Sequence, residues 1–148
     1  MEWSAKTSRG RVRPENEDSW TVQTFPDGML LAIVADAMGG VNGGEVASSL
    51  AVKYCTEYVV QNKDREQRPE ELLRGAVRYA NRKVYEASGT PAGASGMGTT
   101  LTCALARQGE PVLYVGHVGD SRAYVTSDTG IRLITEDQSI TGELIRNG

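Results

Sequence analysis

The sequence has few of the side chains from which many metal and nucleophilic sites are built. Its 148 residues include one histidine, His117, and two cysteines, Cys55 and Cys103. A single histidine excludes a histidine-rich zinc or iron centre, and the absence of a C-x-x-C pair argues against structural zinc. Each cysteine lies in a segment with periodic apolar residues, which predicts two buried, reduced thiols and agrees with a reducing cytosol.

Long apolar runs and concentrated positive charge are missing as well. The longest apolar run, residues 29–35, is far shorter than a membrane span, and the first ten residues contain no apolar signal region. The 16 lysines and arginines are scattered among 19 acidic residues, giving a net charge of −3. The sequence therefore contains no cluster of basic residues of the kind that binds nucleic acid. We therefore expect a soluble cytoplasmic protein, or the soluble part of a longer one, with no nucleic-acid or membrane partner. Its acidic surplus suits divalent cations.

Apolar residues occur in two kinds of pattern, which are kept in separate blocks of the chain. Alternation predicts strands over 3–8, 19–25, 29–35, 99–106, 112–118, 123–126 and 131–134. Helical spacing predicts helices over 44–61 and 69–87. Residues 135–138 are expected to start a further helix over 140–146, with Thr135 as its cap. Because strands and helices are segregated along the chain, we expect an α+β fold with antiparallel sheet, and the length fits a single domain.

Carboxylates stand at the predicted ends of several strands. A turn at Pro26–Gly28 would pair the strands on either side of it and bring position 18 close to position 36. Glu17 and Asp18 would then lie near Asp36, and Asp120 ends another strand. Such carboxylates repel one another unless a cation neutralises them, and all-oxygen ligands select Mg²⁺ or Mn²⁺. Taken singly, each of them is equally compatible with a solvated turn or a helix cap.

Five short motifs occur in a consistent order along the chain. They are GRVRPENEDS (10–19), VADAMGGVNGGEVAS (34–48), GMGTTL (96–101), GHVGDSRAY (116–124) and LITEDQS (133–139). In this order and spacing the chain resembles the metal-dependent type 2C protein serine/threonine phosphatases in their bacterial form. The resemblance extends over essentially the whole chain. It implies an antiparallel β-sandwich flanked by helices on both outer faces.

The resemblance also implies a centre of two Mn²⁺ or Mg²⁺ ions at one end of the sandwich. Asp36 matches the residue that bridges both ions, and Ala37 matches a residue that ligates through its carbonyl oxygen. Glu17 and Asp18 match an acidic pair that supports the ions. Asp120 matches an aspartate linked to a third, weaker metal site.

The same likeness implies how the substrate is held and hydrolysed. Arg13 matches an arginine that grips the substrate phosphate, and a planar guanidinium suits two phosphoryl oxygens. Two cations that share a water lower its pKa and provide a hydroxide for in-line attack on phosphoserine or phosphothreonine. The expected partner is a phosphorylated protein, the target of a serine/threonine kinase, and the expected cofactors are Mn²⁺ or Mg²⁺.

Two departures from the family pattern leave alternatives open. Glycine is usual where Ala37 stands, and a Cβ there would be strained if the backbone needed a positive φ. Family domains continue past residue 148 with two further metal-binding aspartates, so residues 1–148 are expected to form a single, C-terminally incomplete catalytic domain. The alternative function is a weakly active or inactive phosphatase-like module that binds a phosphoprotein or another partner. Uncovered sheet edges would also allow a homodimer or strand exchange.

Overall fold

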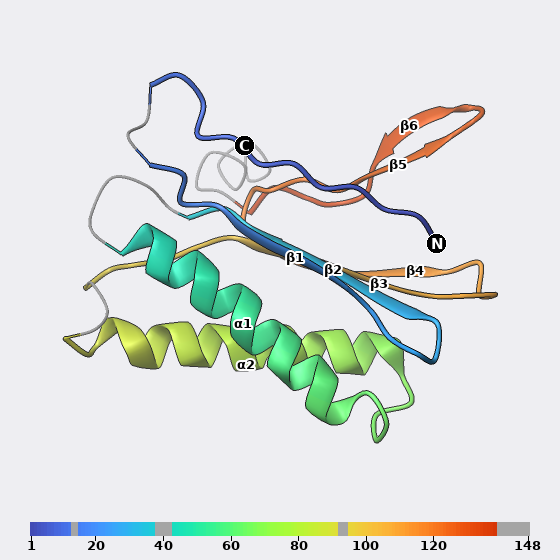
Figure 1. The fold of residues 1–148 in the computed structure, drawn as a ribbon, viewed down its shortest axis with the longest axis horizontal. Coiled ribbons are helices and arrows are strands. Elements are labelled where there is room, and N and C mark those ends of the chain that lie inside the picture. The colour runs from blue at the N-terminus through green and yellow to red at the C-terminus, as the bar shows by residue number, and fades with distance from the viewer. Residues whose placement is uncertain (13–14, 38–42, 92–94, 139–148) are drawn as a thin grey trace, which may run out of the picture.

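The computed structural model describes residues 1–12, 15–37, 43–91 and 95–138. Two helices pack on one face of a four-stranded antiparallel sheet, and a separate two-stranded hairpin lies on the other side of that sheet (Figure 1). This arrangement confirms the α+β class. The elements are β1 (Ser19–Thr24), β2 (Met29–Ala35), α1 (Gly44–Asn62), α2 (Pro69–Ser88), β3 (Leu101–Arg107), β4 (Leu113–Val118), β5 (Tyr124–Ser127) and β6 (Gly130–Leu133).

The hairpin of β1 and β2 has the pairing that the sequence predicts. Ser19 lies opposite Ala35, so the start of β1 and the end of β2 meet at the same end of the ladder. In the turn, the Gly28 N–H donates to the Phe25 carbonyl at 3.0 Å. Gly28 has a φ of +80°, a conformation that residues with a Cβ rarely adopt. This turn fixes the register and therefore fixes which residues face each other at the far end.

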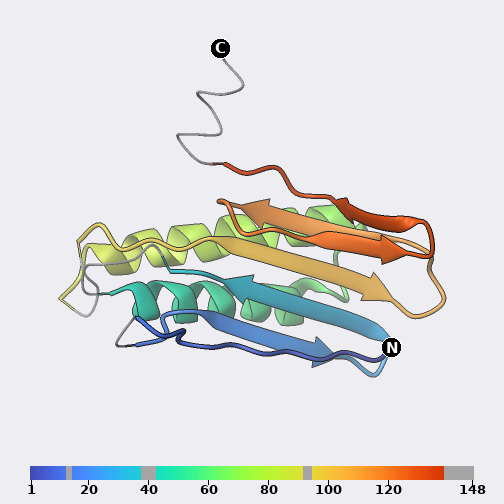
Figure 2. The same cartoon turned by 90° about the horizontal axis from the view of Figure 1, so that it is seen from above.

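The sheet has the order β1-β2-β3-β4, with all neighbouring strands antiparallel (Figure 2). Strand β2 is internal, and its side chains alternate between the helical face and the open face. Met29, Leu31 and Ile33 are buried against the helices, whereas Val34 on the opposite face is about half exposed. In sequence, both helices lie between the neighbouring strands β2 and β3. The chain therefore leaves the sheet at the end of β2 and returns to it at that same end, where β3 begins.

The helices begin where local chemistry favours a helix start. Gly43, with a φ of 116°, reverses the chain before α1, and Pro69 occupies the first turn of α2 with Glu70 and Glu71 beside it. A proline has no N–H to lose in the first turn, and acidic side chains favour the positive end of the helix dipole. Within the described residues, neither helix has the length and apolar character needed to cross a lipid bilayer.

The two cysteines meet at the interface between helix and sheet. Cys55 on α1 and Cys103 on β3 are fully buried and are not joined by a disulfide, as the sequence predicts. The contact with the Cys103 sulfur and burial together raise the pKa of the Cys55 thiol far above its usual range. A thiol held in this way stays protonated and unreactive. The contact with Cys55 lowers the pKa of the Cys103 thiol, but Cys103 is equally buried, so neither thiol is exposed as a nucleophile.

Two sequence predictions about regular structure are wrong for the described residues. Residues 3–8 were expected to form an edge strand, but they are irregular and lie along the open face of β1 and β2. A strand needs a neighbour for its ladder, and no backbone hydrogen bond to another strand is found for this segment. The tetrapeptide 135–138 does not begin a helix, because the Thr135 hydroxyl accepts a hydrogen bond from the Ala123 N–H. The expected helix at 140–146 lies outside the described residues.

The close packing of α2 on β4 predicts an effect on stability. A Cβ added at Gly116 on β4 would lie 2.9 Å from the Cys103 sulfur and 3.3 Å from Val77. Gly116→Ala should therefore lower the free energy of unfolding by about 1–3 kcal/mol through overpacking. Thermal and urea unfolding measure it. Gly89→Ala is the control, because a Cβ there meets only ordinary contacts; equal loss in both variants would contradict the packing argument.

Candidate metal and phosphate site

Three of the expected carboxylates gather at one end of the sheet. Glu17 and Asp18 directly precede β1, and Asp36 directly follows β2, close to the start of α1 (Figure 1). These residues line one polar cavity of about 240 Å³. The full set of lining residues is Ser8, Arg9, Gly10, Glu15, Asn16, Glu17, Asp18 and Asp36. The register of the hairpin thus brings together acids that are 18 or 19 positions apart in sequence.

The backbone of Asp36 is held on both sides by two threonines of the GMGTT motif. The Asp36 N–H donates to the Thr100 hydroxyl at 3.0 Å, and the Thr100 N–H donates to the Asp36 carbonyl at 2.8 Å. The Thr99 hydroxyl donates to the same carbonyl at 3.0 Å. Ala37 and Thr99 form an isolated bridge just beyond the end of the β2–β3 ladder. The carboxylate is therefore carried on a fixed stretch of backbone.

Thr100 also connects Asp36 to the turn that contains Asp120. Its hydroxyl lies 2.7 Å from that of Ser121. Gly119, with a φ of 104°, packs so tightly on Thr100 that a Cβ would lie 2.7 Å from the threonine methyl. Asp120 itself is exposed and does not line the cavity with Asp36. The buried Thr100 hydroxyl thus connects the end of β2 to the turn after β4 by hydrogen bonds.

A buried serine holds the acidic pair against α1. The hydroxyl of Ser48 donates to the Glu17 carbonyl at 2.6 Å and lies 2.9 Å from the Ser19 hydroxyl. Ser48 is fully buried and has a third partner within α1, the Glu45 carbonyl at 3.2 Å. The first two contacts hold the Glu17 backbone and the Ser19 side chain, which flank Asp18. The position of the acidic pair is therefore set by a helix side chain as well as by the hairpin.

The Glu17 side chain lies close to the first residue of α1. A Cβ built on Gly44 would lie 2.9 Å from a Glu17 carboxylate oxygen and 3.0 Å from the Ala37 Cβ. A Cβ here would push the flexible end of the Glu17 side chain aside, so glycine at this position leaves the Glu17 carboxylate in place. None of the described non-glycine residues, Ala37 among them, has a positive φ. The strain that a positive φ would have caused at Ala37 is therefore absent.

The segment after β6 folds back on the turn that follows β4. Arg122 forms a two-pronged ion pair with Asp137, with a shortest distance of 2.7 Å, and this contact lowers the pKa of Asp137. Gln138 bonds to Gly119 through both its N–H and its side-chain oxygen. The Nδ1 atom of His117 lies 2.9 Å from the Thr102 hydroxyl, and its Nε2 atom is buried with no hydrogen-bond partner among the described residues. These contacts hold the Gly119–Arg122 turn in place.

The donor atoms at this end of the sheet suit a hard cation but do not by themselves enclose one. Carboxylate oxygens in a polar cavity are the ligands that Mg²⁺ and Mn²⁺ prefer. Among the described residues, however, no three acidic, histidine or cysteine side chains converge closely enough to hold a metal ion. Arg13, the expected phosphate ligand, lies outside the described residues. The described chain therefore offers part of a binding shell.

Comparison with known proteins identifies the family of the chain. The family model described as Protein phosphatase 2C matches residues 7–146. The chain belongs to this family. A relative from Listeria monocytogenes, the serine/threonine phosphatase stp, is 35% identical over 145 residues. That alignment covers 97% of this chain and 57% of the relative, so the chain spans a little over half the length of that protein.

Solved structures of similar proteins show the same fold. A bacterial serine phosphatase matches with a TM-score of 0.85 at 33% identity, covering 97% of this chain and 57% of that one. The catalytic domain of the phosphatase PstP, solved in complex with two manganese ions, matches with a TM-score of 0.74 at 34% identity. The match covers 98% of this chain and 59% of the PstP chain. The phosphatase 2C fold is thus shared over the whole of the described chain.

Several residues that shape the site were not singled out from the sequence. Arg9 lines the acidic cavity, and Thr100 and Ser48 fix the backbones that carry the acids. A signal for Ser48 existed, because it falls at helical spacing from the buried Val52 and Cys55. A polar residue on the buried stripe of a helix needs a partner. No comparable signal marks Arg9 in the sequence.

The buried serine generates a prediction with a built-in control. Ser48→Ala should lower the free energy of unfolding by about 1–3 kcal/mol, because the Ser19 hydroxyl and Glu17 carbonyl lose their partner. Ser49→Ala, the same change one residue later at an exposed position, should stay within about 0.5 kcal/mol. Chemical denaturation measures both. Similar values for the two variants would show that the buried bond contributes little.

The close contact at Gly44 generates a second prediction. Gly44→Ala should displace Glu17 and weaken Mn²⁺ binding, although alanine normally favours a helix over glycine. Ala37→Gly in the same protein removes one of the two clashing groups and should restore part of the loss. Calorimetric Mn²⁺ titration of the single and double variants measures this coupling. Strictly additive effects would rule out a shared steric cause.

Proposed function

We propose that this chain is the first part of a Mn²⁺- or Mg²⁺-dependent catalytic domain that hydrolyses phosphoserine and phosphothreonine in proteins. The observation that carries the proposal is the fixed backbone of Asp36, which presents a carboxylate beside Glu17 and Asp18 in one polar cavity. The family relationship supports the same chemistry. The phosphatase names of the similar proteins and the manganese ions bound by PstP agree with it.

The proposed metal ligands differ in how they are held. Asp36 would hold the ions through its carboxylate, which stands on a backbone fixed by hydrogen bonds at both its N–H and its carbonyl. Ala37 would contribute its carbonyl oxygen, and its side chain does not prevent this because its backbone φ is not positive. Glu17 and Asp18 would support the ions from the start of β1. Asp120, on the turn tied to Thr100 through Ser121, is proposed for a separate, weaker ion.

Charge in the cavity indicates how a phosphate monoester would be bound. When bound, Mn²⁺ or Mg²⁺ would supply an activated water and neutralise the phosphoryl oxygens. We assign the gripping of those oxygens to the Arg13 guanidinium. Arg9 lines the acidic cavity and adds positive charge there. The buried thiols take no part, so no covalent phosphocysteine forms.

The exposure of the acidic cavity supports a protein substrate. Most of the residues that line the cavity are exposed, which is compatible with the approach of a loop of a folded protein. We therefore propose phosphorylated targets of a serine/threonine kinase as substrates and a cytoplasmic site of action. The Listeria relative, a serine/threonine phosphatase, is consistent with this class.

Activity provides the direct test of the proposal. The protein encoded by the complete reading frame should hydrolyse p-nitrophenyl phosphate and a phosphothreonine peptide only with Mn²⁺ or Mg²⁺. Asp36→Asn should lower kcat/KM by at least about 100-fold, as expected for loss of a metal ligand. Asp27→Asn, in the turn at the opposite end of the hairpin, is the control and should leave kcat/KM unchanged. Absence of turnover with every divalent ion would refute the proposal.

A further inference from the structure

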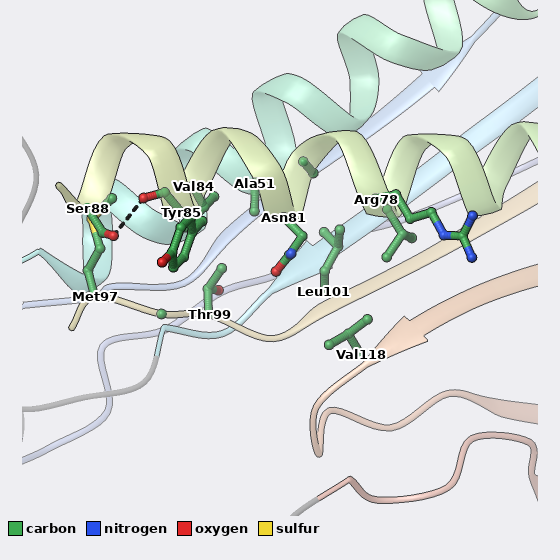
Figure 3. A pocket seen from close by; sticks show the side chains of 13 residues that line it. Ala51, Arg78, Asn81, Val84, Tyr85, Ser88, Met97, Thr99, Leu101 and Val118 are labelled. Carbon is green, nitrogen blue, oxygen red and sulfur yellow. Dashed lines mark hydrogen bonds between the residues drawn. The ribbon is translucent and has the colours of Figure 1, made fainter. Parts of the chain in front are cut away.

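A second cavity lies on the helical side of the sheet, away from the acidic site. It has a volume of about 520 Å³ and is bounded by the C-terminal half of α2, the segment 97–99 and the ends of β3 and β4 (Figure 3). Pockets of 300–1,000 Å³ are typical of small-molecule sites. None of the carboxylates assigned to the metal site lines it. The cavity is therefore separate from the proposed phosphatase centre.

The walls of this cavity are mainly aliphatic. Val84 comes from α2, Leu101 from β3 and Val118 from the end of β4, with Met97 at one side. Val118 remains 42% exposed, so part of the apolar lining is open to solvent. Burial of such surface by a ligand would be favourable at roughly 25 cal/mol per Å². The walls thus suit an aliphatic chain.

Two polar side chains on α2 border the aliphatic walls. Asn81 points from the helix toward the strand residues Thr99 and Leu101 (Figure 3). Arg78, one turn earlier, is exposed at the rim that this cavity shares with the neighbouring cleft along β4. Within the described residues, neither side chain makes a hydrogen bond or an ion pair. An amide and a guanidinium with free donors are complementary to a carboxylate.

We propose that this cavity binds an aliphatic carboxylate, with its chain between α2 and β3 and its carboxylate at Asn81 and Arg78. The occupant is a small amphiphile rather than a protein segment, because an aliphatic wall and one cationic rim match a chain with a single anionic end. Nothing in this assignment depends on metal binding at Asp36. The site would exist whether or not the chain is a phosphatase.

The cavity also contacts the structure that holds Asp36. Thr99 lines the cavity, and its hydroxyl donates to the Asp36 carbonyl at 3.0 Å. A ligand packed against Thr99 therefore restricts the motion of the segment that fixes Asp36. Coupling of this kind acts in both directions, so occupancy of the acidic site would alter affinity for the carboxylate as well.

Titration with decanoate tests the proposal on the chain itself. Amide NMR should show saturable shifts that centre on Asn81, Thr99 and Leu101, and slower hydrogen exchange at the Asp36 amide. Decanol, which has the same chain without the charge, should bind about tenfold more weakly, because it lacks the charge-assisted bond. Equal binding of decanol and decanoate would overturn the assignment of the head group.

Matched variants separate the two parts of the site. Val118→Trp should fill the mouth and abolish binding, whereas Val60→Trp, at a similarly exposed position on α1, should not. Arg78→Gln should weaken decanoate binding about tenfold, and Arg82→Gln on the same helix should leave it unchanged. Shifts that persist in Val118→Trp, or equal losses in the two arginine variants, would refute the proposal. Neither result bears on the phosphatase assay, which measures a different site.

Discussion

The arrangement of this end of the molecule depends on how one strand terminates. Beyond Ala35 the β2–β3 ladder gives way to threonine hydroxyls, so the Asp36 backbone is satisfied by Thr99 and Thr100 instead of by a regular strand partner. Three hydrogen bonds to Thr99 and Thr100 fix the backbone that carries the Asp36 carboxylate, at the end of the sheet where Glu17 and Asp18 also lie. The cluster of negative charge is therefore built into the fold, and the chemistry proposed for it follows from that constraint.

Residues of α1 also help to fix the position of the acidic residues. Ser48 ties the first turns of α1 to the backbone around Asp18, while Gly44 lets that helix approach Glu17 and Ala37 within van der Waals distance. Both residues sit where helix propensity alone would favour alanine. The start of α1 is thus shaped by the site more than by helix stability, which is the kind of local conflict expected at functional positions.

Most of the fold could be predicted from the sequence because its signals are local. The Pro26–Gly28 turn fixed the pairing of Ser19 with Ala35, and Pro69 marked the start of α2. Residues 3–8 were misjudged because alternation shows only that a segment could form a strand, whereas a strand also needs a partner. The gathering of Glu17, Asp18 and Asp36 followed from hairpin symmetry. The roles of Thr100 and Arg9 could not be predicted. Thr100 contacts a residue more than 60 positions away, and Arg9 lies in an irregular segment, so neither belongs to a periodic pattern in the sequence.

The acidic cavity combines carboxylates from two segments of the chain, one before β1 and one after β2. Four carboxylates line about 240 Å³ with one arginine among the described residues. Carboxylates gathered in one cavity repel one another, and a helix N-terminus, an arginine or a bound cation reduces that repulsion. The start of α1 lies beside Glu17, and Arg9 lines the same cavity. Cations that bind the folded chain and not the unfolded chain would stabilise the fold further. A cavity of this composition is better suited to holding cations than to stabilising the sheet end.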